Sequence, residues 1–199
     1  DKRNKKMKSI VVFCGSSEGI VSDYGVKAYE LGETFAKKDI QLVYGGAKIG
    51  IMGKVAEGVL NNKGKVIGVI PVFLKKKEVV HKGLTELIVT QNMHERKLKM
   101  HELSDGIIML PGGFGTLEEF FEMLTWSQLG LHQYPIGILN TNGFYDSLLQ
   151  MMHDMVQNGF VKKEHLNTIL VDDTIETLLD KMENYIPLPT PKWINKEQL

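Results

Sequence analysis

Short apolar runs alternate along this chain of 199 residues with longer stretches in which apolar residues recur every three or four positions. The short runs are typical of strands buried on both faces of a sheet, and the longer stretches are typical of helices with one apolar side. The pattern predicts strands over residues 8–14, 40–44, 65–70, 84–89, 105–110, 135–139 and 167–171. It predicts helices over residues 23–38, 50–61, 92–103, 116–129, 144–157 and 174–184.

This alternation predicts an α/β fold, because a helix that crosses over between two strands makes those strands parallel. Right-handed crossovers then give a Rossmann-like, doubly wound parallel sheet of about seven strands. We expect one domain over residues 8–186, preceded by a flexible tail or leftover segment at 1–7 and followed by an extended, proline-containing tail at 187–199. In such a sheet the ligand is expected at the carboxyl ends of the strands.

Three glycine turns follow predicted strands at that edge of the sheet. Gly15-Ser16 follows the first strand, Gly45-Gly46 follows the second, and the run from Gly112 to Gly115 follows the fifth. Glycine lets the backbone turn sharply and brings bare N–H groups close to an anion, and the start of the helix after the third turn adds its positive dipole end. Together the turns predict one polar crevice that binds a phosphate group.

Two carboxylates, Glu118 and Glu119, lie just beyond the third turn. They place an acid beside the predicted phosphate site. The spacing of Thr116 and Glu119 is also that of a capping box, in which the threonine oxygen accepts the Glu119 N–H and the glutamate reaches back to the Thr116 N–H. The segment is therefore either a phosphate cradle with an acid or an ordinary helix start.

The helix predicted over residues 92–103 carries two cations on a partly apolar face. Asn92 is its expected N-cap, and Met93, Arg96, Lys97 and Met100 follow helical spacing. A cation on an inward face needs an anionic partner, and a phosphate would serve.

The glycine turns do not form the motifs of the large nucleotide cofactors. Glu118 stands where the dinucleotide fingerprint has its third glycine, and the second strand ends in Tyr44 without an acid for a ribose hydroxyl. The Walker pattern is absent, since Gly50 is followed by Ile51 and Met52. A mononucleotide fits better than NAD or ATP with magnesium.

Metal and thiol chemistry are disfavoured as well. His94 and His101 lie seven positions apart, whereas two zinc ligands on one helix need a spacing of four. The single cysteine, Cys14, rules out an internal disulfide and is expected to be a small buried side chain and not a nucleophile. We therefore expect no metal.

Composition is that of a globular enzyme domain, with 43% hydrophobic and 24% charged residues. Lys and Arg together number 24, as do Asp and Glu, so a net charge of zero predicts no bulk attraction to nucleic acid or membrane. The expected partner is a small molecule. The sequence shows neither a long apolar run nor a cleavable signal, and a cytoplasmic location is expected.

Two motifs carry a family resemblance. Met93-His94-Glu95-Arg96-Lys97 and the run from Pro111 to Glu119 resemble the signature of the LOG family, the cytokinin riboside 5′-monophosphate phosphoribohydrolases, long mislabelled as lysine decarboxylases. The resemblance runs from about Ile10 to Ile186 and includes Tyr44-Gly45-Gly46 and Val69-Ile70-Pro71. It implies a homodimer, with residues 124–129 and the 144–157 helix as candidates for the interface.

The resemblance also implies roles for single residues. Arg96 and Glu119 match the catalytic pair, Lys97, the run from Gly113 to Glu118 and Thr125 match nucleotide contacts, and Glu78 matches an acidic contact near the base. With the glycine turns added, the expected substrate-binding residues are Gly15, Ser16, Gly45, Gly46, Glu78, Lys97, Gly112, Gly113, Phe114, Gly115, Thr116, Leu117, Glu118 and Thr125.

The chemistry of these groups gives a functional hypothesis. Breaking the N-glycosidic bond of a nucleotide builds positive charge on the ribose, which a carboxylate such as Glu119 stabilises while it activates water. Arg96 would orient the substrate and assist the departing base. The expected reaction converts an adenine-type nucleoside 5′-monophosphate, a cytokinin riboside or AMP, to free base and ribose 5-phosphate without a cofactor.

Two other functions remain open. One is a non-catalytic carrier that binds a nucleotide or cofactor on the same fold. The other is a pyridoxal phosphate-dependent lysine decarboxylase, although no lysine lies in a recognisable cofactor context. The sequence leaves the base open among isopentenyladenine, adenine and other purines.

Overall fold

The computed structural model describes residues 6–77 and 79–189. Its strands form one sheet, and all seven predicted strands are confirmed. They are Ser9–Phe13 (β1), Gln41–Tyr44 (β2), Val66–Pro71 (β3), Glu86–Thr90 (β4), Gly106–Met109 (β5), Ile136–Leu139 (β6) and Ile169–Asp172 (β7).

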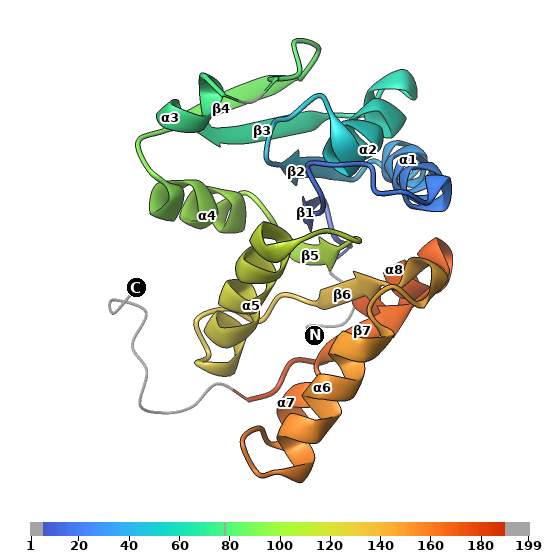
Figure 1. Cartoon of the computed structure of the whole chain (residues 1–199), viewed down its shortest axis with the longest axis vertical. Coiled ribbons are helices and arrows are strands. Elements are labelled where there is room, and N and C mark those ends of the chain that lie inside the picture. The colour runs from blue at the N-terminus through green and yellow to red at the C-terminus, as the bar shows by residue number, and fades with distance from the viewer. Residues whose placement is uncertain (1–5, 78, 190–199) are drawn as a thin grey trace.

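The sheet has the order β4-β3-β2-β1-β5-β6-β7, and every neighbouring pair is parallel. The chain first winds outward from β1 to β4 and then returns to the other side of β1 with β5 (Figure 1). This confirms the doubly wound α/β fold. Loops after β1 and β5 leave their strands toward opposite sides, so a crevice opens between them at the carboxyl edge.

Each of the six predicted helices is present. They are Ser22–Lys37 (α1), Gly50–Asn61 (α2), Met93–Glu102 (α4), Phe114–Gln128 (α5), Asp146–Gln157 (α6) and Ile175–Glu183 (α8). The structure adds two short helices, Val72–Lys75 (α3) and Lys163–Leu166 (α7), and a 3₁₀ turn at Thr141–Gly143 (η1). These one-turn elements are too short to produce a hydrophobic period, so the pattern did not reveal them.

Alternate residues of the central strand supply two cores, one on each face of the sheet. Ile10 and Val12 pack with α1, α2 and α8, while Val11 and Phe13 pack with α4, α5 and α6. Figure 1 shows these two groups of helices flanking the strands. Because β1 is buried on both faces, its sequence from Ile10 to Phe13 is a continuous apolar run without alternation.

The predicted tails fall mostly outside the described residues. At the amino end, Met7 is described and is buried in the core beneath α8. At the carboxyl end, Pro187 and Pro189 are described and line a surface cavity. Among the described residues, no helix has the length and apolar character needed to cross a bilayer.

Candidate active site

The three glycine turns meet in one cavity of about 300 Å³ at the carboxyl edge of the sheet. It lies where the chain changes direction between β1 and β5, as expected for a doubly wound sheet. Its lining residues come from β1, α2, α4, α5 and the turns after β1, β2 and β5, and are Val12, Phe13, Cys14, Gly15, Ser16, Gly45, Met52, Met93, Arg96, Gly113, Phe114, Gly115, Thr116 and Glu119.

The turn between β5 and α5 forms one wall of this cavity. Gly113 is the N-cap of α5, and no side chain caps that helix end. Thr116 lies inside the first helical turn, so the alternative of a capping box from Thr116 to Glu119 is wrong. The unpaired backbone N–H groups at this helix start are available to an anion in the cavity.

The glycines of this turn serve two different purposes. A Cβ built on Gly112 would collide with the side chain of Thr116 and lie 2.9 Å from the Gly15 nitrogen. A Cβ on Gly113 or Gly115 would meet nothing within 4 Å. Packing within the protein therefore requires the glycine at Gly112, whereas Gly113 and Gly115 leave open space on the cavity side for a ligand to approach the backbone.

Arg96 is a buried cation in the cavity wall. Its side chain is 4% exposed, its Nε donates to the Val69 carbonyl at 2.9 Å, and its Nη2 donates to the Gly45 carbonyl at 2.9 Å. A buried charge is costly unless it is compensated, and an anionic ligand in this cavity would compensate it.

The start of α4 aims Arg96 at the cavity. As predicted, Asn92 caps this helix, accepting the Glu95 N–H through its side chain at 2.9 Å. Glu95 completes the cap by accepting the Gln91 N–H at 2.8 Å. One turn later, Arg96 points inward to the Val69 carbonyl within β3 and the Gly45 carbonyl just after β2.

Glu119 reaches the same cavity from the second turn of α5, where its side chain is half-buried. Burial raises the pKa of the Cys14 thiol, and the charge of Glu119 raises it further. The carboxylate and the thiol line the same cavity, at the end of β1. Cys14 is buried, as predicted, and its raised pKa favours the neutral thiol over the nucleophilic thiolate.

Lys97 departs from the expectation that a phosphate balances both cations of this helix. Its Nζ lies 2.6 Å from Glu118 Oε1 and 2.5 Å from Glu122 Oε2, so two carboxylates of α5 neutralise it. Burial, the largest single contribution, lowers the pKa of Lys97, but the hydrogen bonds that it donates to these carboxylates and their charges together raise it above its usual value. Lys97 thus ties α4 to α5 and does not line the cavity.

Comparison with known proteins bears on the identity of this site. Residues 52–182 match a family described as "Possible lysine decarboxylase". The chain is 43% identical over 183 residues to a probable cytokinin riboside 5′-monophosphate phosphoribohydrolase of Oryza sativa, covering 92% of this chain and 81% of that protein. It is 43% identical over 182 residues to a cytokinin riboside 5′-monophosphate phosphoribohydrolase of Arabidopsis thaliana, covering 92% and 85%.

The chain belongs to the LOG family. The matched segment contains Arg96 and Glu119 together with the whole β5–α5 turn. Solved structures of lower identity share the fold. One is a molybdenum cofactor binding protein of Rippkaea orientalis, with a TM-score of 0.66, 23% identity and coverage of 88% and 95%. Another is a molybdenum cofactor carrier protein of Chlamydomonas reinhardtii, with a TM-score of 0.64, 19% identity and coverage of 88% and 95%.

Several residues that the LOG resemblance or the glycine turns singled out lie beside the cavity and not in its lining. Gly46 has a φ of +86° and its carbonyl accepts the His81 N–H at 2.9 Å, which fixes the second turn. Thr125 lies on the exposed side of α5, with its hydroxyl on the Glu122 carbonyl at 2.9 Å. Gly112, Leu117 and Glu118 likewise do not line the cavity, and Glu78 lies outside the described residues.

The sequence did not reveal Met52 as a lining residue. Its side chain would collide with a Cβ on Gly45, so it packs tightly on the second turn. Nothing in the period of α2 distinguishes it from a core methionine. Met93, which the helical spacing placed on the inward face, does line the cavity.

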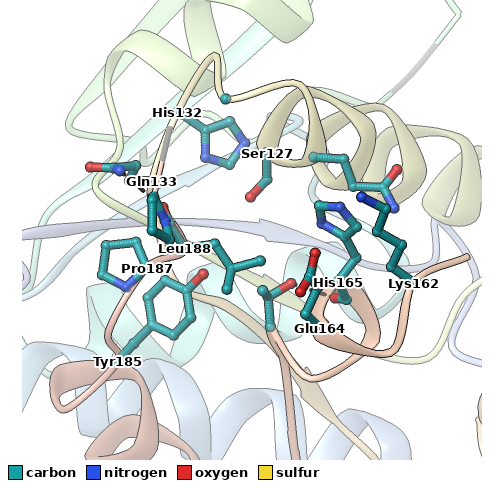
Figure 2. A pocket seen from close by; sticks show the side chains of 13 residues that line it. Ser127, His132, Gln133, Lys162, Glu164, His165, Tyr185, Pro187 and Leu188 are labelled. Atoms are coloured by element: carbon teal, nitrogen blue, oxygen red, sulfur yellow. Dashed lines mark hydrogen bonds between the residues drawn. The ribbon is translucent and has the colours of Figure 1, made fainter. Parts of the chain in front are cut away.

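A second cavity, of about 480 Å³, lies at the opposite edge of the sheet (Figure 2). Its residues precede β6 and β7 or follow α8, which places them at the amino ends of the strands. Tyr185, Pro187 and Leu188 face Lys162, Glu164 and His165 across it. It has no glycine cradle comparable to that of the LOG-family motif, and we do not assign the reaction to it.

His132 lines this second cavity and should make the stability of the fold depend on pH. Its Nε2 donates to the Met123 carbonyl at 2.8 Å and its Nδ1 accepts the Tyr134 N–H at 3.1 Å, so the ring is neutral. Burial lowers its pKa to about 4. Since an unfolded histidine titrates near 6.5, the unfolded chain binds the extra proton between pH 6.5 and 4, and the free energy of unfolding should fall by about 3 kcal/mol across that window.

Urea unfolding of the whole chain at pH 7 and at pH 4.5 checks this prediction. His132→Gln should flatten the dependence, whereas His153→Gln, at an exposed position, should leave it as in the wild type. His101 contributes in the same direction, because burial lowers its pKa too. Equal stability of the wild type at both pH values would contradict the assignment.

Proposed function

We propose that this chain hydrolyses the N-glycosidic bond of an adenine-type nucleoside 5′-monophosphate and releases the free base and ribose 5-phosphate. The observation that carries the proposal is that Arg96, a buried cation, and Glu119, a carboxylate, line one cavity walled by open glycines. The names of relatives that are 43% identical along most of their length support it.

The phosphate is best placed at the start of α5. There the amides after Gly113 are free of helical partners, and the open faces of Gly113 and Gly115 admit an oxygen to hydrogen-bond distance. Anchoring at this point holds the rest of the nucleotide along the cavity, where positioning lowers the entropic part of the barrier.

With the phosphate fixed there, Glu119 faces the ribose from one helical turn further along α5. As the bond from C1′ to the base nitrogen lengthens, the ribose gains positive charge that the carboxylate stabilises. Glu119 accepts a proton from the attacking water, whose oxygen bonds to C1′ as the bond from C1′ to the base nitrogen breaks. That proton, or one exchanged with solvent, ends on the nitrogen of the departing base, so Glu119 is ionised again at the end of the cycle.

Arg96 retains N–H donors beyond the two that bind Val69 and Gly45. Two backbone carbonyls already hold the guanidinium in place. Its remaining N–H donors can therefore bind a ligand without a further loss of Arg96 side-chain entropy. We assign them to the sugar hydroxyls or to the departing base. This role gives a reason for a buried cation beside the cavity.

The description "Possible lysine decarboxylase" attached to the matched family does not fit this cavity. A pyridoxal phosphate enzyme forms a Schiff base through a lysine, and none of the described residues that line the cavity is a lysine. Lys97, which follows the lining residue Arg96 in the sequence, forms ion pairs with Glu118 and Glu122.

The deciding experiment is incubation of the purified chain with AMP and with isopentenyladenosine 5′-monophosphate, followed by chromatographic measurement of free base and ribose 5-phosphate. Release of both products in equal amounts from at least one nucleotide is the expected result. The matching nucleosides, which lack the phosphate, should be hydrolysed far more slowly. Nucleotide binding without product release would instead favour a carrier.

Two further proposals concern assembly and location. We propose a homodimer, whose interface would use side chains that one chain leaves exposed, such as Leu129 at the end of α5 and Met151 on α6. Light scattering after size-exclusion chromatography tests it. We also propose a cytoplasmic location, which imaging of a tagged chain in cells would check.

A further inference from the structure

Tyr145 is a buried tyrosine outside the cavity whose hydroxyl contacts the β5–α5 turn from behind. Its side chain is 3% exposed and precedes α6. The hydroxyl donates to the Leu110 carbonyl at 2.6 Å, within the protein interior. The Gly112 backbone lies near the same oxygen and lowers the pKa of the phenol against the larger, opposing effect of burial. The hydroxyl therefore binds Leu110 at one end of the Leu110-Pro111-Gly112 segment and lies near Gly112 at the other.

The same segment is held on its other side by β1. The Gly15 N–H donates to the Pro111 carbonyl at 3.0 Å, and the Leu110 N–H donates to the Phe13 carbonyl at 2.9 Å. The turn thus lies between two fixed supports, the end of β1 and the Tyr145 hydroxyl. A glycine-rich turn has few side chains of its own to define its path, so these outside contacts determine where Gly113 and Gly115 present their amides.

Tyr145 is itself held firmly. Its backbone N–H donates to Asn140 Oδ1 at 2.8 Å, and Asn140 Nδ2 donates to Asp146 Oδ1 at 2.7 Å. Its ring packs edge-on against Phe144, with centroids 4.8 Å apart. The carboxyl end of β6 therefore fixes the phenol, which can transmit that fixed position to the turn.

The phenol acts as a neutral hydrogen-bond donor. Burial raises the pKa of Tyr145 well above its usual value, so the hydroxyl keeps its proton at neutral pH. Tyr145 is absent from the cavity lining and cannot exchange a proton with the ribose or base. Its influence on a ligand must pass through the turn.

We propose that Tyr145 is a positioning residue for ligand binding, which holds the Leu110–Gly112 segment so that the amides at the start of α5 match a phosphate group. The proposal rests on the proposed function for its effect on turnover, while its effect on phosphate binding is independent of turnover. It adds a residue that neither the glycine motif nor the LOG resemblance singles out.

Tyr145→Phe tests the proposal, because it removes only the hydroxyl and keeps the buried ring. We expect the Kd for ribose 5-phosphate, measured by calorimetry, to rise about three- to tenfold, as for the loss of one hydrogen bond that orients the site. The KM for the nucleotide should rise by a similar factor, while kcat changes less than twofold.

Ser104→Ala is the matched control. Ser104 is buried, its hydroxyl donates to the Met100 carbonyl at 2.8 Å, and it precedes β5 at the edge of the sheet away from the cavity. Both variants lose one buried hydroxyl-to-carbonyl hydrogen bond, so both should lower the Tm. Only Tyr145→Phe should weaken binding of ribose 5-phosphate.

The outcomes are separable. A Tyr145→Phe chain that binds ribose 5-phosphate as tightly as the wild type, or a Ser104→Ala chain with the same loss of affinity, would overturn the positioning role. A wild type that binds ribose 5-phosphate but releases no base would refute the hydrolase alone, and the Kd values would still decide on Tyr145. A wild type that neither binds nor hydrolyses would refute both.

Discussion

Glu119→Gln should abolish most base release while leaving the fold unchanged. The substitution keeps the size of a half-buried side chain in the second turn of α5 and removes only its charge and its ability to accept a proton. General-base catalysis contributes on the order of 10²- to 10⁴-fold in rate, so kcat should fall by about that factor. The Kd for ribose 5-phosphate should change by less than about threefold, because the anion is bound by backbone amides and not by the carboxylate.

The measurement is kcat from chromatographic quantification of free base, together with the Tm of each variant. Glu164→Gln is the matched control, since Glu164 lines the second cavity at the opposite edge of the sheet. It should retain wild-type turnover. Equal losses in both variants, or wild-type turnover in Glu119→Gln, would remove Glu119 from the mechanism.

The fold was predictable because the strands of a parallel sheet that is buried on both faces consist of continuous apolar runs, which are visible in the sequence. Gly106–Met109 lies within the run predicted at 105–110, and similar agreement holds for the other strands. The short elements α3, α7 and η1 could not be predicted, because they show no periodic spacing of apolar residues. Each is shorter than the window in which helical spacing is visible.

The candidate site was predictable to the extent that it follows from topology. Parallel strands end at one edge, so the turns at Gly15, Gly45 and Gly113 had to meet. Topology could not tell which of the two adjacent cations on α4, Arg96 or Lys97, lines the cavity. Arg96 lines the cavity, whereas Lys97 pairs with Glu118, 21 positions further along the chain. Only the packing of α4 against α5 determines which of the two meets Glu118 and Glu122.

Gly115→Ala should weaken ligand binding without weakening the fold. Gly115 lies in the first turn of α5 and a Cβ there would meet no protein atom within 4 Å. Alanine favours the helix over glycine by up to about 1 kcal/mol, so the Tm should stay the same or rise. The added methyl would occupy the space through which a phosphate oxygen reaches the amides. Loss of one hydrogen bond to a charged group should raise the Kd for ribose 5-phosphate about tenfold or more.

Gly112→Ala provides the contrast within the same motif. Its Cβ would collide with Thr116 and crowd the Gly15 backbone, so the turn and the end of β1 would have to separate and the Tm should fall by several degrees. The two substitutions add the same methyl group three positions apart, yet one should affect the ligand and the other the protein. Wild-type affinity in Gly115→Ala would mean that the anion does not approach α5 at this glycine, and the phosphate would then have to be sought at the turn after β1, where Gly15 and Ser16 line the same cavity.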